Sequence, residues 1–531
     1  MDRRPDRWDY ACATALAALT VLSRLPFRAR LLYNWDAVQF ALALAEYDVA
    51  KHQPHPPGYI LYVGLGRLAH ACFGDATAAY VALSIAFSGL STFVVYLLAC
   101  AMYDRATAVA ASIVLAVSPL SWFYGSVGLT YAAEAVLASI VAYFAHRALD
   151  GSESDAWLGA AYLGLAGGLR QSLLLLLFPL WLGAVLVGAR RARTALVGLA
   201  ILGVCVAAWF APMVWLTGGL ERYLDASHEL AVLALKPTSV VTGAPETTLR
   251  MSRYLLESVV VALGPLAIAV ALVPWYVRRG LWGRRESFLV GWTVAPVLVY
   301  TLVHFGQAGY VLTFLPALVI LLTRVLLAAL ARAAERLPRL GRAAVAAGVV
   351  ALVVLANGAF FVSARPLPRD FDTRAPVWRR TIEDDAFDWI FSRTAAALRE
   401  HEAVVRTFVG AIREAHPPGD TVVITEVGNA RSYPWLRHAM FYLPEYPVYG
   451  LLMGDGRIGY YVPNHTTTMT PIMDGVVPLP PGARRLVWFV DHWNPEAARP
   501  RGLVEIALPH GRYLYVLPLG RRPVRYAGYT L

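Results

Sequence analysis

Long apolar stretches separated by short polar segments run through the first two thirds of the chain. Most are close to the roughly 20 residues that a helix needs to cross a bilayer. A shorter apolar helix at 59–73 is interrupted by Arg67 and His70, so we expect it to lie at the membrane interface. The pattern predicts about eleven membrane helices, near residues 9–27, 78–101, 106–124, 130–147, 157–169, 172–189, 195–216, 254–277, 287–304, 310–330 and 343–363.

The pattern changes after residue 364, beyond which no stretch is apolar enough to span a membrane. A helical pattern at 386–415 is followed by short strand candidates at 421–425, 446–453, 486–490, 503–508 and 512–518. Helices that alternate with strands indicate a small α/β domain. We therefore expect two domains, a transmembrane domain at 1–364 and a soluble α/β domain at 365–531.

Composition supports the membrane assignment. Hydrophobic residues make up 58% of the chain and charged residues 16%, whereas a soluble domain carries about 25% charged residues. The net charge of +11 would suggest a nucleic-acid partner for a soluble protein, but here the basic residues gather at helix ends. The sequence contains no P-loop, dinucleotide-binding or HExxH motif, and its four cysteines lack metal or disulfide spacing.

Arginine-rich loops predict the orientation of the chain. Because such loops stay in the cytoplasm, we expect a cytoplasmic N-terminus and an uncleaved first helix in a plasma (inner) membrane. The 28–58 loop, the 217–253 loop and the C-terminal domain would then be extracytoplasmic. The loops that carry this argument are 190–193, 278–285 and 332–342.

The first extracytoplasmic loop is unusually polar, with Asp36, Asp48, His52 and His55. Asp36 follows Trp35, an aromatic residue that would hold it at the headgroup level, where a carboxylate can accept a proton from an acceptor hydroxyl. Taken alone, such an acid is more readily a hydrated interface charge, and its polar surroundings in this loop favour the chemical role. His52 and His55 lie among prolines that fix the backbone, and they can donate hydrogen bonds to a phosphate. The same turn also serves to start the next helix.

Arg170 interrupts two apolar helices on the side away from the basic loops. An arginine buried there needs an anionic partner. We favour a lipid phosphate, which a guanidinium binds in bidentate fashion. The alternative is an ion pair with Asp36, Asp48 or Glu134.

The order of these features resembles the GT-C glycosyltransferases. A first helix is followed by an acid in the first outer loop, by a His55-Pro56-Pro57 turn that opens a short helix, and by a span ending in Tyr103-Asp104-Arg105. The resemblance covers roughly residues 8–330 and extends to the dolichyl-phosphate-mannose protein mannosyltransferases of family 39 and their bacterial relatives. Those enzymes move a sugar from a polyprenyl-phosphate carrier to an acceptor on the outer face. The family often has an acidic pair in the first loop, but Ala37 takes the second place here, so a divalent cation is not firmly implied.

The resemblance also implies roles for individual residues. Tyr131 and Glu134, in the second outer loop, are expected to line the cavity with Asp48. Glu134 is equally the acid that the start of a helix favours. The 304–316 stretch matches the Gly-Tyr…Pro segment that lines the carrier-phosphate region in the relatives. For any one of its residues, an ordinary helix turn with an interfacial tyrosine is an equal alternative. The expected donor contacts are His52, His55, Arg170, His304, Gln307 and Tyr310.

The sequence therefore predicts an α-helical polytopic membrane protein of the GT-C type that transfers a hexosyl or pentosyl group. The donor would be a polyprenyl-phosphate sugar, the acceptor a protein, glycan or lipid, and the reaction an inverting single displacement with Asp36 as base. A flippase for a polyprenyl-linked glycan could use the same arginine, although the sequence shows no repeat of two halves. A non-catalytic scaffold for envelope assembly is the third hypothesis.

Overall fold

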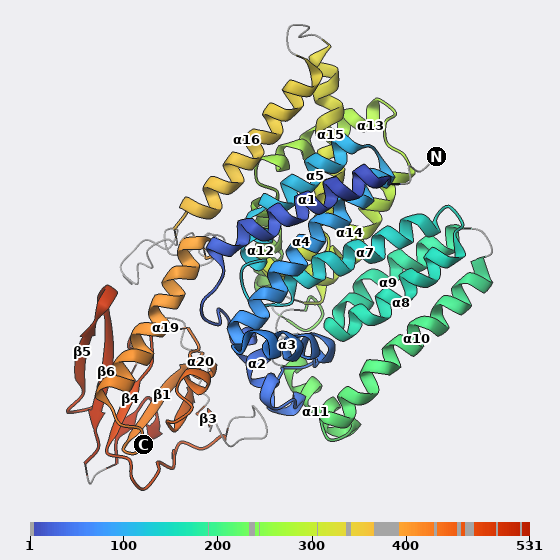
Figure 1. Ribbon diagram of the computed structural model, residues 1–531. Helices are drawn as coiled ribbons and strands as arrows, with labels where there is room; N and C mark the ends of the chain where they lie inside the picture. The colour runs from blue at the N-terminus through green and yellow to red at the C-terminus, as the bar shows by residue number, and fades with distance from the viewer. Residues whose placement is uncertain are drawn as a thin grey trace. The chain divides into compact units, whose positions relative to one another are not determined.

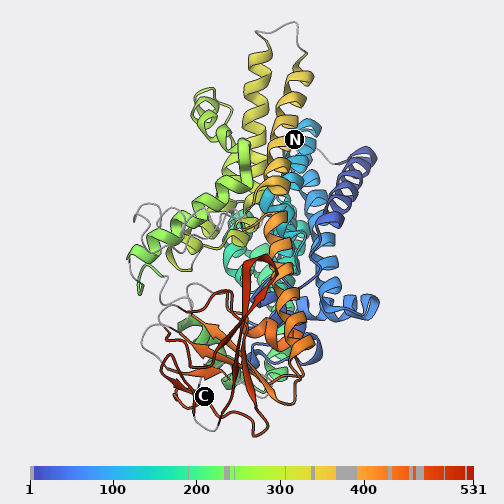
Figure 2. The same ribbon diagram turned by 90° about the vertical axis from the view of Figure 1, so that its left-hand side faces the viewer.

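The computed structural model (Figures 1 and 2) is mainly helical. It describes residues 5–188, 191–232, 239–243, 245–304, 306–335, 341–365, 392–428, 433–453, 458–461, 472–494, 497–520 and 523–531.

The chain divides into two compact units. The membrane unit comprises Met1–Ala29, Tyr59–Leu220 and Ser227–Leu398, and the C-terminal unit comprises Arg30–Gly58, Glu221–Ala226 and Arg399–Leu531. The first polar loop is thus part of the C-terminal unit. The predicted domain boundary at 364/365 adjoins residues outside the described part of the chain, and it stays a prediction.

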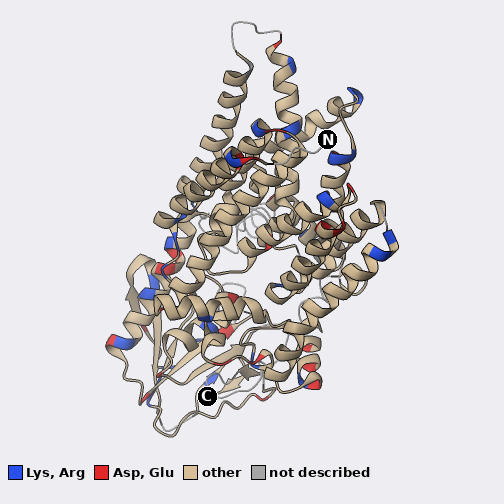
Figure 3. Ribbon diagram, turned by 45° about the vertical axis from the view of Figure 1, so that its right-hand side comes forward, with Lys and Arg blue, Asp and Glu red and all other residues tan. Residues whose placement is uncertain are grey.

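Each of the predicted spans contains helix, because a backbone in an apolar environment must satisfy its own hydrogen bonds. Among the described residues, six helices are long and apolar enough to cross a membrane. Charged side chains lie mainly near helix ends and connections, while most of each helix length is uncharged (Figure 3). The helices are α1 Arg7–Arg24, α4 Ala76–Met102, α5 Arg105–Val117, α6 Pro119–Tyr124, α7 Tyr131–Ala148, α8 Glu153–Leu169, α9 Ser172–Val187, α10 Arg191–Leu216, α12 Pro245–Leu263, α13 Val273–Arg278, α14 Arg284–Leu302, α15 Leu315–Ala334 and α16 Arg342–Ser363.

Prolines and a glycine divide three of the predicted spans. Pro119 begins α6 and leaves Ser118 extended, so the 106–124 span becomes α5 and α6. The 254–277 span changes at Gly264, where φ is +55°, into the 3-10 helix η4 (Gly264–Leu272). The last of the three begins as the 3-10 helix η5 (Ala308–Thr313), and α15 starts beside Pro316.

The α4 helix is central in the membrane unit, where it packs against α1, α3 (Ile60–Phe73), α5 and α7 (Figure 1). The α7, α8 and α10 helices continue the bundle, and α15 and α16 lie side by side (Figure 2). Tyr62 of α3 stacks on Tyr80 of α4 at 5.1 Å between ring centroids, and both rings are fully buried. The short helix predicted at 59–73 therefore packs firmly within this unit.

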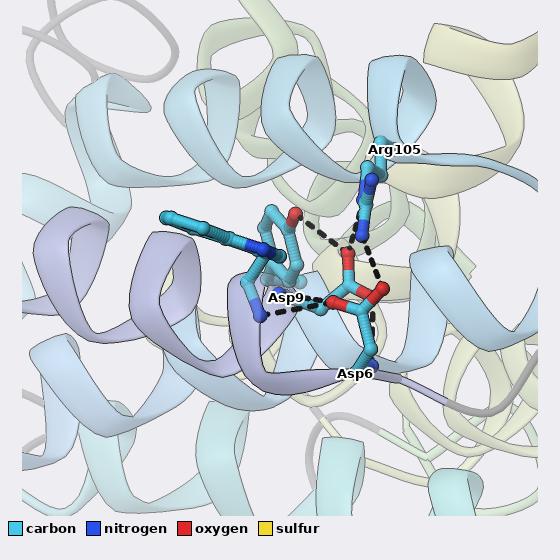
Figure 4. A network of polar contacts seen from close by, with 5 residues as sticks. Asp6, Asp9 and Arg105 are labelled. Atoms are coloured by element: carbon cyan, nitrogen blue, oxygen red, sulfur yellow. Dashed lines mark hydrogen bonds and ion pairs between the residues drawn. The ribbon is translucent and has the colours of Figure 1, made fainter.

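Carboxylates fix the start of α1 (Figure 4). Asp6 accepts hydrogen bonds from the backbone N–H groups of Trp8 at 2.9 Å and Asp9 at 3.2 Å, and Asp9 accepts one from Asp6 at 2.9 Å. Arg105, the first residue of α5, donates to both carboxylates. Negative charge at a helix N-terminus is favourable, so this network joins the starts of α1 and α5.

A sheet forms the core of the C-terminal unit. Counted in sequence order, its first, second and fourth strands are parallel to one another. The third, fifth and sixth strands each pair with their neighbours in antiparallel fashion. The strand candidates in the sequence are confirmed to within a few residues. Among the described residues the sheet has six strands in the order β3-β2-β1-β4-β6-β5, formed by Tyr460–Tyr461, Val448–Leu452, Thr421–Val427, Arg485–Trp488, Arg512–Pro518 and Val504–Leu508.

Both faces of this sheet are covered. The helices α19 (Ala395–Ala415) and α20 (Leu436–Tyr442) pack on one face, and the hairpin β7 (Arg525–Tyr526) and β8 (Tyr529–Thr530) packs on the other. Strand β1 is therefore buried on both sides, which explains why Val422, Val423 and Ile424 are consecutive apolar residues rather than alternating with polar ones.

The first polar loop contains a helix that was not predicted from the sequence. The helix α2 (Trp35–Ala45) begins after Asn34, whose side chain accepts a hydrogen bond from the backbone N–H of Asp36. Asparagine is a strong helix cap. Asp36 therefore lies in the first turn of a helix rather than in an extended loop. This helix packs against α20 within the C-terminal unit.

Candidate functional site

Arg170 is the centre of a buried polar cluster in the membrane unit. It lies directly after α8, where the backbone becomes extended, and its side chain is 10% exposed. Its Nη1 atom is 3.1 Å from Oε1 of Glu134 and donates to Oγ1 of Thr130 at 2.9 Å. The other Glu134 oxygen accepts a hydrogen bond from Thr313 at 3.0 Å. Of the partners weighed for Arg170, the structure pairs it with Glu134, in the first turn of α7.

Tyrosine rings surround this ion pair. The guanidinium carbon of Arg170 lies 5.9 Å from the ring centroid of Tyr59, 5.1 Å from that of Tyr131 and 4.8 Å from that of Tyr310. Tyr300 stacks on Tyr310 at 4.7 Å between centroids. Aromatic faces attract cations within about 6 Å, so the rings hold the guanidinium in a fixed position.

The segment before α15 completes this cluster. The Tyr131 hydroxyl donates to Oε1 of Gln307 at 2.9 Å, and the Tyr310 hydroxyl is 3.3 Å from Nε2 of His304. Gly309 permits the close approach, because a Cβ atom there would lie 2.6 Å from the Tyr131 ring. The structure thus brings together six of the predicted site residues, namely Tyr131, Glu134, Arg170, His304, Gln307 and Tyr310.

A second cluster lies in the C-terminal unit. Oδ1 of Asp36 is 3.8 Å from Nδ1 of His55, with 33% of the Asp36 side chain and 14% of the His55 side chain exposed. The His55 ring is 5.6 Å from the ring of Phe40, one helical turn after Asp36. A carboxylate next to an imidazole, and still open to solvent, is a suitable arrangement for proton transfer.

The other two polar residues of this loop have different surroundings. Burial, with smaller contributions from Arg437 and His55, lowers the pKa of His52 to about 3, so its imidazole is neutral at neutral pH. Asp48 accepts a hydrogen bond from the backbone N–H of Ala50 at 3.0 Å and one from Arg222 at 2.7 Å. The Asp48 carboxylate therefore stabilises the turn, and its predicted role in the cavity stays a prediction.

Three residues of these clusters were not predicted from the sequence. Tyr59 and Tyr300 contribute rings next to Arg170 or Tyr310, and Arg222 pairs with Asp48. Tyr59 could have been noticed in the sequence, since it ends the proline turn and directly precedes α3. Tyr300 and Arg222 are recognisable only from contacts between segments far apart in the sequence.

Within the described part of the chain, no group of three or more His, Cys, Asp or Glu side chains is arranged to hold a metal ion. Asp36 and His55 belong to no such group among the described residues, and Ala37 offers no ligand.

Comparisons with known proteins extend this description. Residues 36–194 match the family described as protein O-mannosyl-transferase TMEM260 N-terminal domain. No curated protein matches the chain.

The fold is similar to that of ArnT from Cupriavidus metallidurans, solved bound to undecaprenyl phosphate. The identity is 16% and the TM-score 0.54, with 84% of this chain and 85% of that chain covered. The apo structure of the same protein matches with 15% identity, a TM-score of 0.53 and the same coverage. An oligosaccharyltransferase from Archaeoglobus fulgidus matches at 12% identity and a TM-score of 0.47, with 83% of this chain and 64% of that chain covered. The chain is thus an integral membrane protein with the fold that the sequence resemblance implied.

Proposed function

We propose that this protein, a member of the GT-C superfamily by its fold and its N-terminal family match, is a glycosyltransferase that uses a polyprenyl-phosphate sugar. The sugar would pass to an extracytoplasmic acceptor by an inverting single displacement. The observation that carries this proposal is the buried Arg170, held by Glu134 and three tyrosine rings. The similarly folded ArnT was solved with undecaprenyl phosphate bound, which supports a carrier of this chemistry.

Arg170 would bind the phosphate of the carrier. A phosphate group offers several anionic oxygens to a guanidinium, whereas Glu134 offers one carboxylate. The carrier would therefore compete with Glu134 for the cation. His304, Gln307 and Tyr310, which lie around the same guanidinium, would add hydrogen bonds to the phosphate.

This charge arrangement would favour the transfer step. As the sugar leaves, negative charge develops on the phosphate oxygen, and a fixed guanidinium in apolar surroundings stabilises that charge strongly. The bond between the anomeric carbon and the phosphate oxygen breaks, and the electron pair remains on polyprenyl phosphate. The acceptor oxygen forms the new bond from the opposite face of the sugar.

Asp36 would accept the proton of the acceptor hydroxyl as that bond forms. Its partial exposure leaves it accessible to an incoming group, and His55 lies 3.8 Å away. His55 would orient the carboxylate and, with His52, contact the donor. His52 acts as a neutral hydrogen-bond donor in this scheme, since its pKa is about 3.

The orientation in the membrane follows from the arginine-rich loops. The N-terminus would be cytoplasmic, and the first loop and the C-terminal unit would be on the extracytoplasmic side of a plasma (inner) membrane. The acceptor would then be a protein, glycan or lipid outside the cytoplasm. A flippase for a polyprenyl-linked glycan or a non-catalytic scaffold would bind the same carrier without releasing polyprenyl phosphate.

The test replaces Asp36 with asparagine. Asp36→Asn should lower kcat by a factor of about 10²–10⁴ and leave carrier affinity unchanged. The matched control is Asp75→Asn, which changes an exposed helix cap at the start of α4, where asparagine caps equally well. Full transfer activity in a folded Asp36→Asn variant would refute the role of Asp36.

A further inference from the structure

The C-terminal unit holds the Asp36 segment through the segment's own backbone. The carbonyl of Leu32 accepts hydrogen bonds from two imidazoles, Nε2 of His401 at 3.2 Å and Nε2 of His438 at 3.0 Å. Three backbone N–H groups also donate to side chains of the unit, Arg30 to Glu402 at 2.6 Å, Leu32 to Tyr442 at 2.8 Å and Trp35 to Tyr433 at 2.8 Å. Because these contacts involve backbone atoms, they fix the path of the chain that leads to Asp36.

One side chain joins the two stretches that carry the candidate catalytic pair. Nη2 of Arg437, on α20, donates to the backbone carbonyl of Lys51 at 3.2 Å. The guanidinium carbon of Arg437 also lies 5.7 Å from the ring centroid of Trp35. Trp35 directly precedes Asp36, and Lys51 precedes His55 by four residues. Arg437 therefore contacts the chain directly before Asp36 and again four residues before His55.

The charge of Arg437 has no acidic partner among the described residues, although the side chain is only 2% exposed. Burial lowers the pKa of Arg437 to about 9, so the group is still charged at neutral pH. A buried cation that is not paired with an acid costs stability, and an apolar side chain of similar volume would pack more favourably. Packing alone does not account for an arginine here.

We propose that Arg437 is a positioning residue, which sets the separation of Asp36 and His55 by holding the Trp35 ring, directly before Asp36, and the Lys51 carbonyl, four residues before His55. The C-terminal unit would then act in the reaction through geometry rather than through a reacting group of its own. This inference rests on the proposed function, because it assigns Arg437 to the transfer step.

The experiment uses the full-length protein in lipid nanodiscs, with Arg437→Ala and Arg437→Lys. The matched control is Arg413→Ala, an exposed arginine of α19 that pairs with Glu445 at 2.7 Å. Three properties are measured for each variant. They are kcat and KM for sugar transfer, affinity for undecaprenyl phosphate, and hydrogen exchange of the backbone amides.

We expect Arg437→Ala to lower kcat by roughly tenfold to hundredfold, since a displacement near 1 Å costs about that much. Carrier affinity should fall much less than kcat, because Arg170, His304, Gln307 and Tyr310 lie outside the loosened segments. Amide exchange should rise in residues 34–40 and 49–55 but not in β1 or β4, and added guanidinium should restore part of the lost kcat. Arg413→Ala should behave like the wild type.

The inference is overturned if Arg437→Ala leaves both kcat and the exchange of these two segments unchanged, or if it weakens carrier binding as much as it lowers kcat. If exchange rises throughout the sheet, Arg437→Lys decides. In Arg437→Lys, a lowered kcat with normal exchange in the sheet supports positioning. An unchanged kcat, or faster exchange throughout the sheet in this variant as well, overturns it. If the wild type transfers no sugar from any donor, the proposed function fails, and the exchange measurement still tests whether Arg437 holds the segment.

Discussion

Breaking the Arg170–Glu134 pair separates a structural role of Arg170 from a functional one. The changes are Arg170→Met, Glu134→Gln and the two together. The paired atoms are 3.1 Å apart, and the two side chains are 10% and 0% exposed. Each single change leaves one buried charge without its partner, whereas the double variant removes both charges and keeps similar volumes.

The magnitudes follow from this burial. Each single variant should lose about 3–5 kcal/mol of unfolding free energy, because an uncompensated charge stays buried. The loss of unfolding free energy in the double variant should be about 2–3 kcal/mol smaller than the sum of the two single losses. Loss of Arg170 also removes its contacts with three tyrosine rings, worth about 0.5–2 kcal/mol each, so the recovery is incomplete.

Carrier binding should follow a different pattern from stability. Arg170→Met and the double variant should bind undecaprenyl phosphate roughly tenfold to hundredfold more weakly. Both lose hydrogen bonds to a charged group, which contribute about 1.5–3 kcal/mol. Glu134→Gln should bind at least as tightly as the wild type, because it removes the competing carboxylate.

The assay pairs detergent unfolding with binding of labelled undecaprenyl phosphate. Arg24→Met is the control. Arg24 is a buried arginine of the same unit, hydrogen-bonded to Ser88 and to the carbonyl of Ala116, so its loss should reduce stability but not carrier affinity. A double variant that binds the carrier as the wild type does would refute the assignment of Arg170 and leave it as a structural ion pair.

Two further predictions concern packing and pH. Gly309→Ala should displace the Tyr131 ring from Arg170, since the added carbon would lie 2.6 Å from that ring, and it should weaken carrier binding by about 0.5–1 kcal/mol. The control Gly291→Ala, with open space around it, should leave carrier binding unchanged. Equal effects of the two changes would contradict a role of the Tyr131 ring in carrier binding. Burial lowers the pKa of His52 to about 3, so its contribution to stability is complete above pH 6.5 and is lost as the pH falls towards 3, by up to about 1.4 kcal/mol per pH unit. In denaturant unfolding between pH 7 and 4, His52→Asn should therefore lose less stability on acidification than the wild type. An equal loss in the two proteins would contradict this assignment of the acid sensitivity to His52.

The membrane helices and the strands were predictable because their signals are local. An apolar stretch of bilayer length must form helix, and Pro119, Gly264 and Pro316 mark breaks that local sequence could also have shown. The α2 helix was missed because the histidines and prolines that follow it at 52–57 indicated a loop for the whole segment. The cap Asn34 and the apolar stretch at 37–45 were local signs of the helix.

The candidate site was partly predictable for the same reason. Arg170 is conspicuous as a charge between apolar helices, and Glu134 was one of three partners proposed for it. Arg437 gave no signal, because its neighbours Trp35 and Lys51 are hundreds of residues away in the chain. Contacts of this kind depend on tertiary packing, which no local pattern encodes.

The central claim is tested most directly by the release of polyprenyl phosphate from a panel of polyprenyl-phosphate sugars by the purified protein, with Asp36→Asn and Arg170→Met measured beside it. The account predicts release from at least one donor by the wild type, and its loss in both variants, with carrier binding retained in Asp36→Asn. Measurable carrier binding by the wild type without release from any donor would contradict the account and favour a flippase or a scaffold.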